Sequence, residues 1–360
     1  VTGQESAISK SSGTATINYV ILKDIKGIGG ALFTANNSID NGNVTGFTIN
    51  SSLARNVYWV GGTGNWNDPI HWSLTSGGLG GNCPPIQLDN VYFDLNSFVT
   101  ANDSVFLDST IVYCKDMDWT GATGNPSFLT TPMNSFGTLK IYGSLTLSSN
   151  LFWSIVYTYF ESNTATNTIT SNGAIINELY TYFSGVGGTW ILQDSLSTTG
   201  SLNISSTSTF NSNNKSISCN QFWNFGTVDL GTSYLTASND FACFGLIDAD
   251  SCTLDVESVT YINGSIYNKI IADNLYGCTI GNATIDSLIV NVYGGYCLMI
   301  DNIINHFEIT GSSDFEMEGS GNSVTKFSTT IPTTILGNNV FTRADFMNDV
   351  SISSENDFGV

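Results

Sequence analysis

A short internal repeat is the sequence feature that most constrains the fold. The run Tyr-Thr-Tyr-Phe at 157–160 recurs at 180–183, an offset of 23 residues. At the same offset, residues 166–170 (TNTIT) fall on residues 189–193 (TWILQ). Two separated runs that share one offset indicate a solenoid, in which each coil repeats the path of the previous one. A coil of roughly 20 to 25 residues with two or three short strands is typical of a parallel β-helix.

The chain around this repeat has the residue pattern of an all-β protein. No long window places apolar residues at helical spacing. Instead, runs of about five alternating or β-branched residues are bounded by Gly, Asn, Ser or Asp. Examples are residues 138–142, 144–148, 201–205 and 285–290. We therefore predict an all-β, right-handed parallel β-helix, since parallel crossovers are normally right-handed. Roughly 13 coils spaced ~4.8 Å apart would form a rod about 60 Å long.

The charge of the chain limits the classes of partner that it can bind. Its 360 residues include 10 Lys and Arg against 30 Asp and Glu, a formal net charge of −20, although only 11% of residues are charged. Nucleic-acid binding needs a basic stripe, whereas the basic residues are scattered singly along the sequence from Lys10 to Arg343. We therefore exclude nucleic acid and disfavour an anionic membrane surface. We also expect no membrane insertion, because no apolar run reaches about 18 residues.

The low charge content itself suits a solenoid. Like charges stacked on successive coils would repel one another, whereas outward Ser, Thr and Asn would not. We therefore interpret the acidic excess as a thin solubilising coat on a secreted rod. The sequence runs from Val1 to Val360 without a signal peptide, and we interpret it as a mature product or as the ordered part of a longer protein.

The composition divides the chain into three parts. Residues 1–52 are interpreted as the end of a preceding β unit. Residues 53–98 form a Trp/Gly-rich cap segment with the first strands, and residues 99–360 form the coils of the β-helix. Three of the seven Trp lie in the middle segment.

These three Trp allow two interpretations. In the favoured interpretation they form a cap that seals the first coil, because Trp buries a large apolar area. The three residues are Trp59, Trp66 and Trp72, and His71 lies beside them in the sequence. Alternatively, their ring faces form a platform that stacks on sugars. The Gly-rich run around them is not a phosphate-binding loop, because it lacks the Lys of that motif and no helix follows.

A family resemblance comes from the same segment. Residues 59–73 (WVGGTGNWNDPIHWS) resemble an opening motif of large surface proteins of Bacteroidetes, which is also found in some phage structural proteins. The match continues to residues 89–94 (DNVYFD), and residues 185–194 are similar to an interior coil of that family. The resemblance implies a secreted, modular β-helical repeat of very long adhesins that the type IX system exports for gliding or attachment. It implies no enzyme activity.

The resemblance also implies a modification. Bacteroidetes attach O-linked glycans to exported proteins at Asp followed by Ser or Thr and then by a hydrophobic residue or Thr. The matching candidates are Ser104, Ser109, Ser195 and Ser287, each directly after an Asp. The expected location is extracellular, at the cell surface.

Residues for catalysis or metal binding are sparse. Only two His are present, His71 and His306, which leaves little for a multi-His metal site or a Ser-His-Asp triad. Asp248, Asp250 and Asp255 are a weak Ca²⁺ candidate, because their segment lacks the Gly and the final Glu of an EF-hand loop. Apart from weakly bound Ca²⁺ we predict no cofactor, and we predict no catalytic residue and no enzyme activity.

The seven Cys contain no CxxC pair, so zinc knuckles and thioredoxin-like chemistry have no support. We interpret them mainly as inward-facing small hydrophobic residues. The alternative is one disulfide, for which Cys83 and Cys114 are the candidate pair.

Three functions stay open at this point. The favoured one is a non-catalytic, extracellular structural or adhesive module of a long cell-surface adhesin or filament that mediates attachment or gliding. Its expected partners are surface polysaccharides or abiotic surfaces, and neighbouring repeat modules of the same polypeptide. The second is a phage tail-fibre or tailspike-like protein that binds host glycans, and the third is a β-helical polysaccharide lyase or hydrolase.

Overall fold

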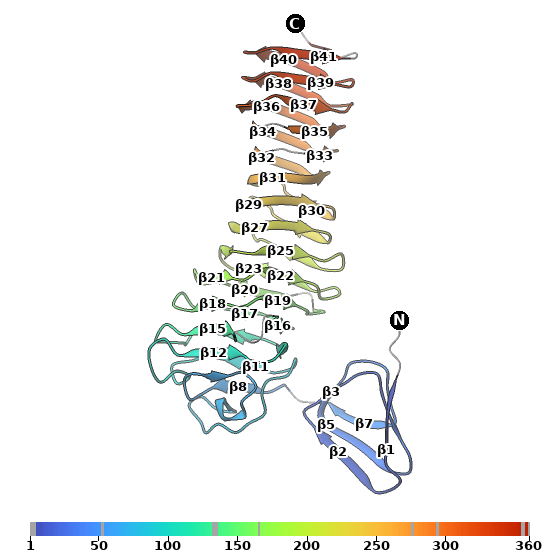
Figure 1. The fold of residues 1–360 in the computed structure, drawn as a ribbon, viewed down its shortest axis with the longest axis vertical. Helices are drawn as coiled ribbons and strands as arrows, with labels where there is room; N and C mark the ends of the chain where they lie inside the picture. The colour runs from blue at the N-terminus through green and yellow to red at the C-terminus, as the bar shows by residue number, and fades with distance from the viewer. Residues whose placement is uncertain are drawn as a thin grey trace.

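The protein is a parallel β-solenoid. The computed structural model describes residues 5–51, 54–131, 136–164, 166–274, 277–292, 295–353 and 357–358. It has 56% strand and 1% helix, and its stacked strands make about 18 turns. Figure 1 shows the coils of the main column following one another along a single axis, with the C-terminal coils at one end. The predicted all-β parallel β-helix is confirmed.

Three parallel stacks of strands form the main column. The first stack contains β12 (Ser104–Leu107), β15 (Ser127–Thr130), β18 (Phe152–Ser154), β21 (Ile175–Asn177), β24 (Leu196–Thr198), β27 (Ile217–Asn224), β29 (Tyr234–Cys243), β31 (Thr253–Asn263), β32 (Ile266–Asn274), β34 (Thr284–Val292), β36 (Ile303–Gly311), β38 (Ser323–Thr329) and β40 (Val340–Phe346). The second contains β13 (Ile111–Cys114), β16 (Thr138–Ile141), β19 (Tyr157–Phe160), β22 (Tyr180–Phe183), β25 (Ser201–Ile204), the later parts of β27, β29 and β31, and then β33 (Cys278–Gly281), β35 (Gly295–Ile300), β37 (Phe315–Glu318), β39 (Thr333–Leu336) and β41 (Val350–Ser353). The third contains β8 (Asn56–Trp59), β11 (Asn90–Tyr92), β14 (Met117–Asp118), β17 (Leu145–Thr146), β20 (Asn167–Thr170), β23 (Thr189–Leu192), β26 (Thr209–Asn211), β28 (Thr227–Asp229) and β30 (Leu246–Asp248).

The long strands of the middle coils turn a corner and serve two stacks at once. In β27, Ile217 pairs with Leu235 in the first stack, and Phe222 pairs with Phe241 in the second. The register shifts between Cys219 and Gln221, which marks the corner. At the far end, β40 also pairs with β42 (Asp357–Phe358).

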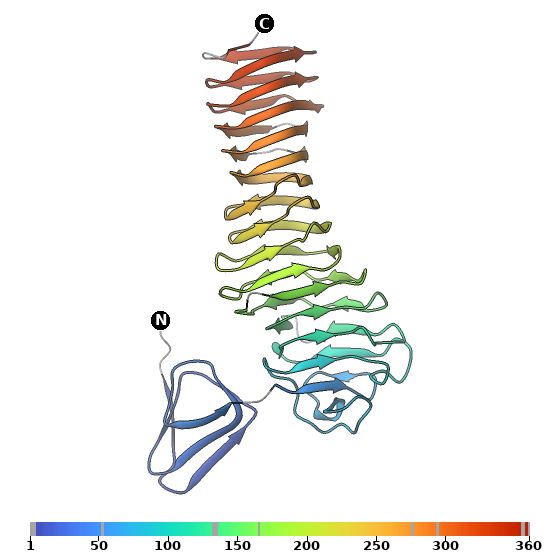
Figure 2. The ribbon, with the colours of Figure 1, turned by 180° about the vertical axis from the view of Figure 1, so that it is seen from behind.

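The first β unit, residues 5–51, is a short parallel stack of its own. It contains β1 (Ser6–Ser9), β2 (Thr14–Asn18), β3 (Ile21–Leu22), β4 (Ile25–Ile28), β5 (Leu32–Asp40), β6 (Val44–Thr45) and β7 (Phe47–Ser51). Every pairing among these strands is parallel. Figure 2 shows this unit as a separate small stack beside the base of the main column. Across the junction, the guanidinium of Arg55 lies over the ring of Tyr19, 5.0 Å from its centroid.

The main column begins with an irregular coil. Strand β8 pairs in parallel with β11 and antiparallel with β10 (Trp72–Ser73). The 3-10 helix η1 (Pro69–His71) leads into β10, and β9 (Gly64–Asn65) pairs with β12. Asp68 caps η1 by accepting a hydrogen bond from the backbone N–H of Ile70.

The repeat in the sequence sets the register of successive coils. Tyr157 pairs with Tyr180 and Phe160 with Phe183, an offset of 23 residues. The other repeated run has the same offset, since Asn167 pairs with Trp190. Inward side chains of these strands form the core, because alternate residues of a strand point to opposite faces. Phe160, Phe183 and Trp190 are all at most 1% exposed.

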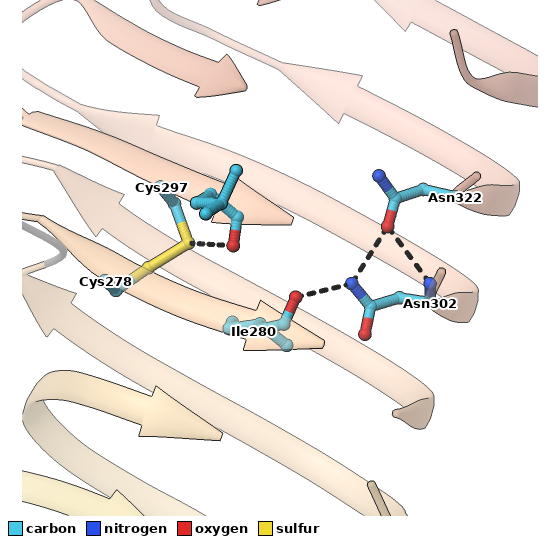
Figure 3. Close-up of a disulfide and its surroundings, with 6 residues drawn as sticks. Cys278, Ile280, Cys297, Asn302 and Asn322 are labelled. Carbon is cyan, nitrogen blue, oxygen red and sulfur yellow. Dashed lines mark hydrogen bonds between the residues drawn. A yellow bond between two sulfur atoms is a disulfide. The ribbon is translucent and has the colours of Figure 1, made fainter. Parts of the chain in front are cut away.

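Polar residues also stack inside the column. Asn302, Asn322 and Asn339 lie on successive coils and are at most 2% exposed. The side-chain amide of Asn302 donates to Oδ1 of Asn322 (2.8 Å), and that of Asn322 donates to Oδ1 of Asn339 (2.7 Å). Asn302 and Asn322 also donate to the backbone carbonyls of Ile280 and Met299. Figure 3 shows the first step of this asparagine ladder, from Asn302 to Asn322, and the hydrogen bond from Asn302 to the carbonyl of Ile280. The ladder satisfies buried backbone groups close to a corner.

One disulfide joins two adjacent coils near this ladder. Cys278 on β33 and Cys297 on β35 are paired in register and bonded, and both are buried (Figure 3). The predicted Cys83–Cys114 pair is therefore wrong. Cys114 lies inside the column, whereas Cys83 lies at the surface, and neither is bonded. The interpretation of inward-facing Cys as small hydrophobic residues is confirmed for four free, buried thiols, those of Cys114, Cys219, Cys243 and Cys252.

Removing the centre of the asparagine ladder should destabilise the column. Asn322→Ala leaves the amide groups of Asn302 and the carbonyl of Met299 without their partner, and each buried group costs about 1–3 kcal/mol when unsatisfied. We expect the free energy of unfolding, measured by urea denaturation, to fall by at least about 2 kcal/mol.

The matched control is Asn305→Ala. Asn305 is exposed, and its side chain bonds Asp286. Its loss should change the free energy of unfolding by about 0.5 kcal/mol or less. Equal effects of the two substitutions would contradict the role assigned to the ladder.

Candidate adhesive surface

Outward-facing aromatic side chains gather on the second stack. The run Tyr-Thr-Tyr-Phe of β19 and β22 sends Thr and Phe inward, so both Tyr of each strand face outward. Thr158 and Thr181 are buried, while Tyr157, Tyr159 and Tyr182 are half-buried and Tyr180 is exposed. Because the coils are in register, the four tyrosines form two columns.

The tyrosine rings stack within and between these columns. The ring centroids of Tyr159 and Tyr182 are 4.7 Å apart with an interplanar angle of 16°. Tyr157 and Tyr180 are 5.8 Å apart, and Tyr180 and Tyr182 are 5.9 Å apart. Partial burial raises the pKa of Tyr159 and Tyr182 above the ordinary value of 10.0. Their hydroxyl groups therefore stay protonated at neutral pH and can both donate and accept hydrogen bonds.

A lysine borders the tyrosines on the preceding coil. Lys140 pairs with Tyr159 in register, and its Nζ lies 5.3 Å from the ring centroid. The same ammonium group binds the carboxylate of Glu161 at 2.8 Å. This contact fixes one end of the tyrosine stack by a cation–π interaction.

The column of Tyr159 and Tyr182 leads to an aromatic residue farther along the rod, and further aromatic residues lie next to it. Tyr182 pairs with Asn203, and Asn203 pairs with Trp223. Two residues after Trp223, Phe225 stacks on Phe244 with centroids 5.2 Å apart. Phe244 in turn stacks on Tyr261 at 4.9 Å. We call Tyr157, Tyr159, Tyr180, Tyr182, Trp223, Phe225, Phe244 and Tyr261 the aromatic surface.

A hollow of about 500 Å³ adjoins the second half of this surface. Phe225 and Phe244 line it and are 45% and 51% exposed. Gly226 and Gly245 also line it, and a Cβ on either would lie 2.2 Å from a backbone carbonyl oxygen. Only glycine fits at these corners, so the coils approach closely there. The result is a shallow groove with an aromatic wall and polar groups, including Asn263, at its margin.

This arrangement is suited to binding a partner rather than to catalysing a reaction. Tyr, Trp and Phe provide large apolar area at low entropic cost, and the phenol and indole groups add hydrogen bonds at the edge. A large exposed apolar patch on a soluble protein commonly marks an interaction site. The sequence run Tyr-x-Tyr contains the signal for this surface, because alternate residues of a strand lie on the same face. In the sequence it also marks the repeat.

The three Trp singled out in the sequence lie elsewhere, in the first coil. Trp59, Trp66 and Trp72 are 0%, 1% and 0% exposed, so none of their ring faces is open to a sugar. The indole N–H of Trp59 donates to the carbonyl of Gly62, and that of Trp72 donates to the carbonyl of Trp66. His71 stacks on Trp59 at 4.6 Å. Their role as a cap stays a prediction.

The weak Ca²⁺ candidates are not gathered into one site. Asp248 ends β30, Asp250 lies in the following turn, and Asp255 is in β31. Asp255 accepts a hydrogen bond from the hydroxyl of Tyr234. Across the residues that the structure describes, no three His, Cys, Asp or Glu side chains are arranged to hold a metal ion.

The four serines predicted to carry glycans are spread along the rod. Ser195 is exposed, and Ser104, Ser109 and Ser287 are half-buried. Ser104 and Ser287 lie in β12 and β34, whereas Ser109 and Ser195 lie between strands. The structure does not bring them together, and their modification stays a prediction.

One titratable residue was missed by the sequence analysis. Glu178 lies between β21 and β22, is 5% exposed, and accepts hydrogen bonds from the hydroxyls of Thr158 and Thr181. Burial raises the pKa of Glu178 from 4.5 to about 8, although these hydrogen bonds act in the opposite direction. Glu178 therefore serves as a neutral hydrogen-bonding group inside the core.

Comparisons with known proteins identify no relative of this chain. No protein-family model, curated protein or solved structure matches the chain. Over the described part of the sequence, no helix has the length and apolar character needed to cross a membrane.

The state of Glu178 predicts a pH dependence of stability. Between about pH 4.5 and 8 the folded protein retains a proton that the unfolded chain releases. Stability from this group is therefore complete below about pH 4.5 and is lost as the pH rises through about 8. We expect the free energy of unfolding, measured by urea denaturation, to fall over this range. It should fall less in Glu178→Gln, because the glutamine amide is nearly the same size as the carboxyl group and forms hydrogen bonds but cannot titrate.

Glu257→Gln, at an exposed site, is the control and should follow the wild-type pH profile. Identical pH profiles for the wild type and Glu178→Gln would contradict the assignment.

Proposed function

We propose that the protein is a non-catalytic, extracellular adhesive rod, a module of a long cell-surface adhesin or filament that mediates attachment or gliding. The observation that carries this proposal is the aromatic surface, which lies along the outside of a regular parallel solenoid. Its stacked rings on successive coils offer an extended contact area to surface polysaccharides or abiotic material.

The construction of the rod supports a mechanical role. Parallel strands pair from coil to coil along the main column. The asparagine ladder and the Cys278–Cys297 disulfide add side-chain links between neighbouring coils. A scaffold of this kind holds its surface residues at fixed spacings, which favours adhesion to extended polymers over binding of a small molecule.

The distribution of carboxylates supports a non-catalytic role. The carboxyl group with a strongly raised pKa, that of Glu178, lies in the core and bonds two threonines. A general acid must reach its substrate, and this group does not face the surface. The aromatic surface itself carries hydroxyl and indole groups rather than paired carboxylates.

Two observations support an extracellular location and the wider assignment. A disulfide is typical of secreted proteins, because the cytosol keeps thiols reduced. The resemblance of residues 59–73 to Bacteroidetes surface proteins favours a type IX secreted adhesin with neighbouring repeat modules. This finer assignment rests on the resemblance alone.

Adhesion should depend on the aromatic surface. The double variant Tyr159→Ala/Tyr182→Ala removes one stacked pair. We expect its retention on cellulose and on polystyrene beads to fall about fivefold or more, because each aromatic contact contributes about 0.5–1.5 kcal/mol.

The matched control is Tyr58→Ala/Tyr92→Ala, which removes a stacked tyrosine pair on the third stack, with centroids 5.1 Å apart. Circular dichroism and thermal melting establish that both variants are folded. The proposal fails if the wild type is not retained on either material, or if the control loses as much retention as the test variant.

A further inference from the structure

The basic residues of the C-terminal half lie in one line. After Lys215 the sequence contains four Lys, Arg or His residues, Lys269, His306, Lys326 and Arg343. In the first stack, Lys269 pairs with Ser287, Ser287 with His306, His306 with Lys326, and Lys326 with Arg343. All four basic side chains thus occupy a single column, which we call the basic column.

The basic column faces outward. After Lys269, His306 and Lys326, the next residue points inward and is fully buried: Ile270, Phe307 and Phe327. Ala344, which follows Arg343, is half-buried. Lys326 and Arg343 are exposed, and Lys269 and His306 are half-buried. With coils ~4.8 Å apart, the column extends about 19 Å along the rod axis. These residues are scattered singly along the sequence, and only the register of the coils aligns them.

Stability alone does not explain this alignment. Like charges placed directly opposite each other on neighbouring strands destabilise a sheet. Lys326 and Arg343 nevertheless occupy successive coils, and His306 stands on the coil before them. In a chain with a net charge of −20, carboxylates are abundant, and such cations could be dispersed among them. A local arrangement that works against stability is expected at functional sites.

Carboxylates beside the column neutralise only part of it. Glu308 lies 3.8 Å from His306, and Asp345 lies 3.2 Å from Arg343. Asp286, at the neighbouring corner, is bonded by Asn305. Among the described residues, no carboxylate oxygen lies within 4.0 Å of the ammonium group of Lys269 or Lys326. On the same strands as these two lysines, the adjacent outward positions are Ile271 and Ser328, which are uncharged. On neighbouring coils, Asp255 pairs with Ile271, and Glu308 and Asp345 pair with Ser328.

We propose that the basic column binds a linear acidic polysaccharide that lies along the rod axis. The column presents cations at intervals of one or two coils in a straight line, and the complementary ligand is an extended chain with regularly spaced carboxylate or sulfate groups. The column belongs to the first stack and the aromatic surface to the second, so two faces of the rod contact polymers in different ways.

An acidic polysaccharide fits the column better than nucleic acid. Duplex DNA carries one charge per ~1.7 Å of its axis, whereas the column offers at most one cation per ~4.8 Å. The flanking Glu308 and Asp345, and the large negative charge of the whole chain, oppose so dense a polyanion. A polysaccharide spaces its charges by one sugar or more and meets less repulsion.

This inference deepens the proposed adhesive function and rests on it, but its test is separate. The intact chain is passed over surfaces carrying dextran sulfate, polygalacturonate or neutral dextran at low ionic strength. We expect binding to the two acidic polymers to be tighter than binding to neutral dextran, and to be lost as salt is added. Any contact of the aromatic surface with neutral dextran should not depend on salt. The variant Lys326→Gln/Arg343→Gln should bind the acidic polymers about tenfold more weakly, because two of the cations are removed.

The control variant Lys23→Gln/Lys26→Gln removes the same charge from exposed sites in the first β unit and should bind as the wild type does. Circular dichroism of each variant verifies the fold. Three results would overturn the inference: an equal loss in the control, binding to neutral dextran as tight as to the acidic polymers, or no binding to the acidic polymers by the wild type. Duplex DNA binding as tightly as the acidic polymers would also overturn it. Such a result would not contradict the proposed adhesion to cellulose or polystyrene, which depends on the tyrosines and is tested separately.

Discussion

Every feature of this protein depends on parallel, in-register pairing of strands between successive coils. The pairing places each side chain directly on its counterpart one coil away, so residues about 20 positions apart in sequence become neighbours ~4.8 Å apart. A residue type that recurs at the coil period therefore becomes a column. The chemistry of each column, inside or outside, decides whether it stabilises the rod or serves another purpose.

Inside the rod, the columns solve the problem of burial in different ways. Phe160 and Phe183 stack as apolar rings. The asparagine ladder binds the buried backbone carbonyls of Ile280 and Met299 close to a corner. Cys278 and Cys297 bond covalently, and Glu178 stays in the core by holding a proton that burial favours. The asparagine ladder and Glu178 satisfy the rule that a buried polar group needs a partner.

Outside the rod, the columns provide the proposed function. Stacked tyrosines form the aromatic surface on one face, and aligned cations form the basic column on another. Neither surface needs a cleft, because an extended polymer can follow a column along the axis. The same geometry that stiffens the rod thus repeats a weak contact many times, which is how a surface protein gains strong attachment from individually weak interactions.

The amino-acid sequence by itself determined the fold class and the register of the clearest coils, because turn residues, alternating runs and the offset of 23 are local signals. It did not determine the disulfide, since Cys83 and Cys114 are closer in sequence to each other than to the other thiols, yet Cys114 faces the core and Cys83 the surface. It left open whether the rings of Trp59, Trp66 and Trp72 are buried or exposed, and the structure buries all three, because burial depends on the whole first coil. Only the tertiary structure aligned Lys269, His306, Lys326 and Arg343. The coils differ in length, so the sequence spacing between these residues is irregular, and the column becomes apparent only when backbone pairing shows which residues lie on one another.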